Sequence, residues 1–283
     1  MGDYLEDEAW LERLARSSRG CISYSSVDKL IECSQRLIKG LGCNTDAIRV
    51  VLKADKEGLR LSIPVSQLPE AWHNLLHVIC IGDYTVYEDF IPRRGWRVID
   101  AGAYLGFYTC YAALKTKQEG LVVAVEPNPL AREWIYVNAA SNRLEDRIRV
   151  DPRALSSLAD TIAELYIPEY WANSSLLENY NPGGYTAPKR KVKVRTISLE
   201  RLLREHGLDK VDLLKMDIEG VEGEVLEAST PLLKDKVIDR LVIEVHPPYT
   251  TTKAITNILK ETGYRIVGEK VIGPNQAIVY ATR

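Results

Sequence analysis

The stretch Trp96-Arg97-Val98-Ile99-Asp100-Ala101-Gly102-Ala103-Tyr104-Leu105-Gly106 decides how this chain folds. It begins as a short apolar strand that ends in an acid, passes through a turn with two glycines, and leads into an apolar helical segment. A glycine such as Gly102 lets the backbone turn tightly and approach a ligand without an intervening side chain. A strand, a glycine turn and a helix in this order form the opening unit of an α/β fold with a ligand site at the turn.

The same strand pattern recurs along the chain. Apolar runs that we expect to be strands cover residues 121–126, 147–151, 211–217 and 239–246, and helices are expected over 130–141 and from the fourth strand to about 233. Near-continuous apolar strands separated by amphipathic helices are typical of a parallel sheet covered on both faces. We therefore predict an α/β, Rossmann-like domain over residues 91–283, with helices on both faces of its sheet.

Each predicted strand ends in a residue that can take part in chemistry. These residues are Asp100, Glu126, Asp151, Asp217 and His246. Ligands of open α/β sheets bind beyond the carboxyl ends of the strands. The sequence therefore predicts that these five side chains surround one site.

Residues 1–90 form a segment of different character. Apolar residues fall on one helical face from Leu5 to Leu14 and again from Leu30 to Leu41, so residues 4 to about 55 are predicted to be helical. Residues 59–65 alternate like a short strand. Because amphipathic helices need a partner surface, we expect a mainly helical extension that packs against the domain and contributes to recognition of the substrate.

Composition limits the classes of protein. The chain has 283 residues, 46% hydrophobic and 27% charged residues and a net charge of -2. These are values of an ordinary globular protein, and no global positive field would recruit nucleic acid, although a local basic patch could.

The cysteines and the N-terminus bear on location. The five cysteines stand at irregular spacing without a CxxC pair, so the sequence indicates neither a zinc ribbon nor a disulfide framework, and we expect reduced thiols. Residues 1–12 contain no apolar signal core, and no run is long enough to cross a bilayer. The prediction is a soluble cytoplasmic protein that does not associate with a membrane.

The turn after the first strand also indicates the cofactor. A dinucleotide fingerprint needs G-x-G-x-x-G, but Tyr104 stands at the position of the second glycine. The spacing D-x-G-x-x-x-G from Asp100 to Gly106 suits a ligand with an amino-acid end and no pyrophosphate, such as S-adenosylmethionine (SAM). Glu126, at the end of the second strand, can accept hydrogen bonds from both ribose hydroxyls.

Several blocks resemble a known family. Residues 98–109 (VIDAGAYLGFYT), Val125-Glu126-Pro127-Asn128-Pro129, residues 196–200 (TISLE), 214–222 (LKMDIEGVE) and 243–247 (IEVHP) are similar to motifs of the FkbM-type methyltransferases. The resemblance covers about residues 84–267 and implies a class I, SAM-dependent methyltransferase that acts on hydroxyl groups of sugars or natural products. One departure is Tyr104, where the family usually has Asn. We expect a cofactor site made of Asp100, Gly102, Tyr104, Gly106, Glu126, Pro127, Asn128, Asp151 and Asp217.

Methyl transfer to a hydroxyl needs positioning and a base that accepts the hydroxyl proton. Asp217 and Glu219 follow the fourth strand in a tight turn at a helix start, where the helix dipole favours carboxylates. Asp217 is the favoured base or substrate anchor, and Glu219 is equally well explained as a helix-start acid. His246, in His246-Pro247-Pro248-Tyr249, is a secondary acid, base or substrate contact, or a structural histidine. Asp217 and Glu219 could also hold a divalent metal, but we predict no metal ligands, because one short carboxylate pair is a thin oxygen cage.

An insertion over residues 161–195 separates the third and fourth strands. It contains Tyr166, Tyr170, Trp171, Tyr180 and Tyr185, the turn at 181–184 and the basic run at 189–195. Aromatic and basic side chains together can bind bases and phosphates, whereas a strand with a solvated charged face is the simpler explanation. In either case we expect the insertion to overhang the active site.

The leading hypothesis is an enzyme that transfers the methyl group of SAM to a hydroxyl of a small molecule or sugar. An RNA methyltransferase acting on a base or ribose keeps the cofactor but changes the acceptor. A SAM-binding regulatory protein without catalysis is disfavoured by the carboxylates at 217 and 219, and an NAD oxidoreductase by the failed dinucleotide fingerprint.

Overall fold

A seven-stranded sheet lies at the centre of the computed structural model, which describes residues 8–53, 58–181, 189–273 and 276–283. Its strand order is β11-β12-β10-β9-β3-β4-β5. The strands are β3 (Arg97–Ala101), β4 (Leu121–Val125), β5 (Ile148–Asp151), β9 (Leu213–Met216), β10 (Arg240–Val245), β11 (Arg265–Gly273) and β12 (Gln276–Thr282).

The connectivity of the sheet brings the predicted site residues to one edge. Strands β3, β4, β5, β9 and β10 pair in parallel, and only β12 among the strands of this sheet runs against its neighbours. The order reverses at β3, which lies between β4 and β9. Such a switch point opens a crevice at the carboxyl ends of the strands.

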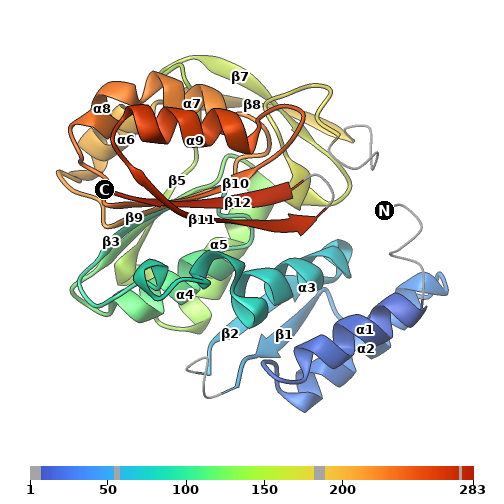
Figure 1. Ribbon diagram of the computed structural model, residues 1–283. Coiled ribbons are helices and arrows are strands. Elements are labelled where there is room, and N and C mark those ends of the chain that lie inside the picture. The colour runs from blue at the N-terminus through green and yellow to red at the C-terminus, as the bar shows by residue number, and fades with distance from the viewer. Residues whose placement is uncertain (1–7, 54–57, 182–188, 274–275) are drawn as a thin grey trace.

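Helices cover both faces of the sheet (Figure 1). Helices α4 (Phe107–Thr116) and α5 (Pro129–Ser141) lie on one face, and α7 (Glu222–Ala228), α8 (Thr230–Lys234) and α9 (Thr252–Glu261) lie on the other, together with α6 (Leu199–His206). Successive strand residues alternate between the two cores: Val98 packs with the first layer and Ile99 with the second. The predicted α/β fold with two covered faces is confirmed.

The N-terminal segment packs against the α4–α5 layer. It comprises α1 (Glu8–Ser18), α2 (Tyr24–Ile38), the antiparallel strands β1 (Ala47–Val51) and β2 (Arg60–Pro64), α3 (Glu70–Leu75) and the π-helical turn η3 (Leu76–Ile81). Its apolar side chains belong to the same core as those of α4. The Asn138 side chain on α5 also accepts a hydrogen bond from the backbone N–H of Ser62 at 2.6 Å. The expected packing is confirmed.

One part of the predicted helical segment is wrong. Residues 47–51 form β1 rather than helix, because Ile48 and Val50 alternate with Arg49 and pair with β2 across the hairpin. The strand expected at 59–65 is confirmed as β2. Leu5, where the first predicted helical face begins, lies outside the described residues.

The insertion contributes β7 (Ile162–Ile167) and most of β8 (Arg190–Ile197) to a small three-stranded sheet, in which β8 lies between β7 and β6 (Ala154–Leu155). Lys191, Lys193 and Arg195 lie on the exposed face of β8, whereas Val194 is buried. This is the solvated charged face that the simpler explanation predicts. Residues 182–188, with the expected glycine turn and Tyr185, lie outside the described residues.

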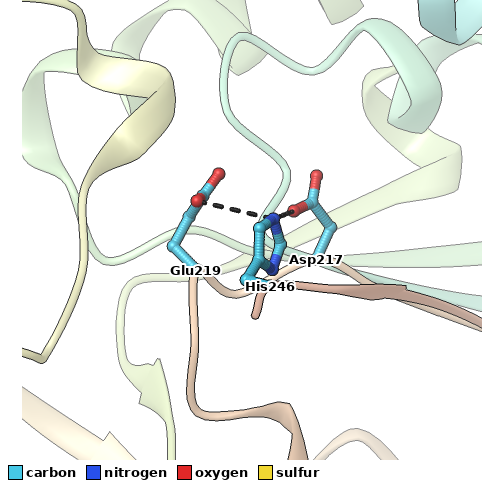
Figure 2. A group of neighbouring side chains, drawn as sticks. All are labelled: Asp217, Glu219 and His246. Carbon is cyan, nitrogen blue, oxygen red and sulfur yellow. Dashed lines mark ion pairs between the residues drawn. The ribbon is translucent and has the colours of Figure 1, made fainter. Parts of the chain in front are cut away.

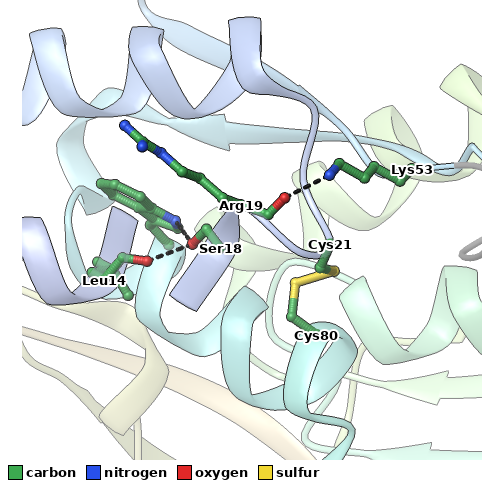
Figure 3. Close-up of a disulfide and its surroundings, with 7 residues drawn as sticks. Leu14, Ser18, Arg19, Cys21, Lys53 and Cys80 are labelled. Atoms are coloured by element: carbon green, nitrogen blue, oxygen red, sulfur yellow. Dashed lines mark hydrogen bonds between the residues drawn. A yellow bond between two sulfur atoms is a disulfide. The ribbon is translucent and has the colours of Figure 1, made fainter. Parts of the chain in front are cut away.

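The prediction of reduced thiols is wrong for four cysteines. Disulfides join Cys21 to Cys80 and Cys33 to Cys43, and Cys110 is free and buried. Figure 3 shows the disulfide between Cys21, which follows α1, and Cys80, which lies in η3. Irregular spacing gives no sign of such pairs, since the N-terminal fold brings together residues 59 positions apart. The free thiols expected from the sequence therefore no longer support a cytoplasmic location.

Within the described part of the chain, no helix combines the length and apolar character that crossing a membrane requires.

Candidate active site

A cavity opens at the carboxyl edge of the sheet, at the switch point. The empty space between its walls, including the part that is open to solvent, is about 630 Å³. Residues from the N-terminal segment, the β3 turn, the end of β4, the insertion and the β9–α7 loop line it. They include Asn74, Gly102, Tyr104, Glu126, Pro127, Trp171, Ser174, Leu176, Asp217, Ile218 and Glu219.

The glycine turn after β3 is packed tightly against the end of β9. Gly102 has φ +75°, and a Cβ at this position would lie 1.7 Å from the carbonyl oxygen of Asp217. No other residue type fits there. Gly106, with φ +79°, precedes α4, and a Cβ there would lie 3.1 Å from Cα of Ile135 on α5. The glycines therefore allow the turn to pack against both the end of β9 and helix α5.

The backbone conformation at position 104 explains why the family usually has Asn where this chain has Tyr. Tyr104 has a φ of +50°, which lies in the left-handed region, where Asn is enriched among residues other than glycine. Its ring is buried, and its side chain lines the cavity. Tyrosine thus keeps the turn conformation at some cost in backbone strain and adds apolar surface to the cavity wall.

Glu126 lies at the end of β4 with both carboxylate oxygens held. One oxygen accepts the backbone N–H of Tyr104 at 2.7 Å, and the other accepts that of Asn128 at 2.8 Å. Burial raises the pKa of Glu126 to about 7, although both hydrogen bonds act in the opposite direction. The carboxylate lines the cavity and is fixed in orientation, which suits an acceptor for ribose hydroxyls.

Asp100 acts behind the cavity wall. It accepts a hydrogen bond from Thr109 at 2.6 Å and lies 3.1 Å from Nζ of Lys215. Lys215 also donates to the carbonyl oxygen of Gly102 at 2.7 Å. Asp100 is fully buried and does not belong to the cavity lining. Asp100 and Lys215 together therefore stabilise the glycine turn.

Asp151 and Asn128 lie beside the cavity rather than in its lining. Asp151 is bound by Arg153 at 2.6 Å and by Nε2 of His206 at 3.0 Å. Asn128 caps α5 by accepting the N–H of Leu130, and it donates to Ser174 at 3.1 Å. The cofactor roles predicted for both residues remain predictions.

The three predicted catalytic residues converge. One ligand-type atom each of Asp217, Glu219 and His246 lies within 4.8 Å of the others. Figure 2 shows the imidazole between the two carboxylates, with Nε2 at 3.6 Å from Oδ1 of Asp217 and 3.6 Å from Oε2 of Glu219. Asp217 and Glu219 line the cavity, whereas His246 is fully buried behind them.

The cluster contains residues that sequence reasoning missed. The hydroxyl of Tyr84, from the N-terminal segment, lies 3.0 Å from Oδ2 of Asp217 and 2.6 Å from Oε2 of Glu244, and the two carboxylates share its single proton. The Tyr180 hydroxyl of the insertion donates to Oε2 of Glu219. Strand alternation in the quoted sequence blocks could have placed Lys215 on β9 and Glu244 on β10, but nothing local marks Tyr84.

Carboxylates outnumber cations in this cluster. Burial raises the pKa of Glu219, against the lowering effect of His246. Burial by itself would lower the pKa of His246, but the neighbouring carboxylates of Glu219 and Glu222 outweigh it and raise the pKa well above its usual value. The site is therefore an electronegative pocket that retains protons and suits a positively charged ligand.

The insertion covers this part of the site, as expected. Trp171, Ser174 and Leu176 line the cavity, and the Tyr180 ring lies 5.0 Å from that of Tyr249. Glu219 adopts φ +57° in the turn beneath them. Non-glycine residues in this region cost energy and cluster at functional sites.

Comparison with known proteins identifies related sequences. A family model described as the methyltransferase FkbM domain matches residues 100–266. Methyltransferase sdnD of Sordaria araneosa is 30% identical over 196 residues, which cover 61% of this chain and 75% of the relative. The 31-O-demethyl-FK506 methyltransferase FkbM of Streptomyces tacrolimicus is 25% identical over 210 residues (63% and 76%). The hexuronic acid methyltransferase AglP of Haloferax volcanii is 25% identical over 232 residues (80% and 87%).

Proposed function

Because this chain belongs to the FkbM methyltransferase family, we propose that it transfers the methyl group of SAM to a hydroxyl of a small molecule or sugar. Family membership makes it a SAM-dependent methyltransferase, and it sets aside the hypothesis of a regulatory protein without catalysis. The acceptor class is the part we propose. Two relatives are named for a 31-O-demethyl compound and for a hexuronic acid, which supports a hydroxyl-bearing acceptor.

The observation that carries the proposal is the position of Asp217. Its side chain lines the cavity, and its Oδ1 is buried without a hydrogen-bond partner among the described residues. Its other oxygen is held by Tyr84, so the carboxylate cannot rotate freely. An oriented carboxylate with one available oxygen suits a base that accepts the proton of a hydroxyl.

The reaction that this site supports is a single displacement. The acceptor oxygen attacks the methyl carbon, the bond between that carbon and sulfur breaks, and S-adenosylhomocysteine leaves. The hydroxyl proton passes to Asp217. Much of the rate comes from holding the oxygen and the methyl group in line.

For the cofactor, we propose that the ribose hydroxyls donate to Glu126 and that the amino-acid end lies over Gly102. Both residues line the cavity. The sulfonium would then face Asp217 and Glu219, where excess carboxylate favours its positive charge. Pro127 and Tyr104 would contribute to the wall beside the ribose.

The RNA hypothesis receives little support from the insertion. Lys191 on β8 pairs with Glu178 at 2.8 Å, and its ammonium lies over the Tyr166 ring. Acids of the insertion thus neutralise part of the basic run, which weakens it as a phosphate-binding surface.

The test is incubation of the protein with SAM labelled in its methyl group and a fractionated cell extract. We expect label in the small-molecule or carbohydrate fraction, and label incorporated about a hundredfold more slowly when Asp217→Asn replaces the wild type. Label that enters RNA, and is released by ribonuclease, would contradict the proposed acceptor class.

A further inference from the structure

We infer that Asp217, Glu219 and His246 bind a divalent transition-metal ion at the floor of the cavity. The site stands on the geometry of these side chains. Its use in catalysis rests on the proposed function, because the ion would hold the acceptor oxygen beside the methyl group.

The three side chains come from two neighbouring strand ends. Asp217 and Glu219 follow β9, and His246 follows β10, the next strand of the sheet. Their ligand atoms all lie within 4.8 Å of one another, and Figure 2 shows them pointing toward a common centre. Shifts of no more than about 1 Å would bring each atom to the ~2.0–2.2 Å of metal–nitrogen and metal–oxygen bonds.

His246 supplies the independent observation. It is fully buried, and its Nδ1 lies 2.9 Å from Oε1 of Glu222. The same oxygen accepts the backbone N–H groups of Ile218 at 3.1 Å and Gly220 at 3.2 Å. Because three donors surround it, Glu222 is held as an acceptor and fixes a proton on Nδ1. The other ring nitrogen, Nε2, is thereby directed toward the acids of the cluster.

Nε2 of His246 has no hydrogen-bond partner within the described part of the chain. It lies 3.6 Å from Asp217 and from Glu219 and 3.5 Å from Oε1 of Glu244. These distances exceed the roughly 2.7–2.9 Å of a charge-assisted N–H···O bond. A nitrogen at similar distances from three carboxylates is therefore better placed to share a cation with them than to donate to one.

Each of the three ligands is also oriented by a neighbour. Tyr84 donates to Oδ2 of Asp217 and leaves Oδ1 toward His246. Tyr180 donates to Glu219, and Glu222 accepts from His246. Partners that fix the ligands from outside are characteristic of metal sites, and histidine bound to a carboxylate is the commonest of them.

The donor set indicates the kind of ion. Calcium and magnesium prefer sites made only of oxygen, whereas imidazole with carboxylates suits manganese, iron or zinc. The ion can enter from the cavity, because Asp217 and Glu219 line it. A bound cation lowers the pKa of a hydroxyl that it coordinates, which eases the loss of the hydroxyl proton that the proposed function requires.

The test is titration of the full chain with Mn²⁺ after treatment with a chelator, followed by calorimetry and by electron paramagnetic resonance. We expect one bound ion per chain. Glu219→Gln keeps the size of the side chain and should weaken Mn²⁺ affinity at least tenfold, as should Asp217→Asn. Thermal unfolding of each variant checks that it is folded.

The matched control is His73→Asn. Nε2 of His73 lies 3.0 Å from Nε2 of His77 on the N-terminal segment, so this pair is another place where a transition metal could bind. The variant should bind Mn²⁺ as the wild type does.

Several results would overturn the inference. These are absence of Mn²⁺ and Zn²⁺ binding by the wild type, affinity that is unchanged in both Glu219→Gln and Asp217→Asn, and loss of the ion in His73→Asn. Displacement of the ion by saturating SAM would also overturn it, since the cluster would then be the site of the cofactor's own positive charge. Methyl transfer to a hydroxyl by ion-free protein would refute the use of the ion in catalysis and leave the proposed function intact.

Discussion

Replacing Glu126 tests the placement of the cofactor most directly. Its two oxygens already hold the N–H groups of Tyr104 and Asn128 at 2.7 and 2.8 Å, so its orientation before binding needs little adjustment. A hydrogen bond to a charged group contributes about 1.5–3 kcal/mol, and an uncharged one about 1 kcal/mol. Glu126→Ala should therefore weaken SAM binding by about 1–3 kcal/mol, which is roughly 5- to 150-fold in Kd.

Calorimetry with SAM and with S-adenosylhomocysteine measures the effect, with Glu133→Ala as a control because Glu133 is an exposed acid on the nearby helix α5. The two ligands share the ribose, so both should lose the same factor. Unchanged affinity in Glu126→Ala would refute the assignment of the ribose to Glu126.

The raised pKa of Glu126 predicts that SAM affinity depends on pH. Burial raises the pKa of Glu126 to about 7, so below that pH the carboxyl holds a proton and accepts hydrogen bonds less well. SAM affinity should rise as pH increases from 6 to 8, by up to about tenfold for each unit below the pKa. In Glu126→Gln this component should disappear. An identical pH profile in wild type and Glu126→Gln would show that the carboxyl does not contact the cofactor.

Three further predictions concern other parts of the molecule. Asp217→Asn should lower single-turnover methyl transfer about a hundredfold or more while SAM affinity stays within about twofold, and full activity would end its candidacy as the base. Tyr84→Phe removes the hydroxyl that Asp217 and Glu244 share; kcat should fall about tenfold, equivalent to ~1.4 kcal/mol, without a change in SAM affinity, and an unaltered kcat would show that Tyr84 only fills space. Cys21→Ser opens a loop whose ends are 59 residues apart and should reduce the free energy of unfolding by about 4 kcal/mol; a denaturation midpoint that does not change on adding reductant to the wild type would contradict this.

The sheet was predictable where its strands are buried on both faces. Residues 98–101, 122–125 and 241–245 are apolar without interruption apart from the site acids, which is the pattern of a central parallel strand. Strand β11 lies at the sheet edge, where its residues are only partly buried, so its sequence lacks that pattern. Strand β12 was missed although its residues 277–281 are buried. The hairpin strand β1 has only five residues, which are too few to show a change of period.

The cluster of Asp217, Glu219 and His246 was predictable for a topological reason. Parallel neighbouring strands end at the same edge, so residues that follow β9 and β10 must lie close together. The roles of Asp100 and Asp151 were harder to predict, because an acid at a strand end can face the cavity or turn back into the wall. The choice depends on Lys215, Arg153 and His206, whose side chains reach these acids from other elements.

The N-terminal segment is the part that sequence reasoning described least well, and the structure makes it part of the active site. Asn74 lines the cavity and Tyr84 binds Asp217, and both lie before the matched family domain, which begins at residue 100. The segment also shares its core with α4, so removing residues 1–80 would expose that face as well as delete Asn74. Point variants are therefore the better test of its role. Because the cofactor residues lie within the family domain and Asn74 lies outside it, we expect Asn74→Ala to change the KM for the acceptor and leave the Kd of SAM unchanged.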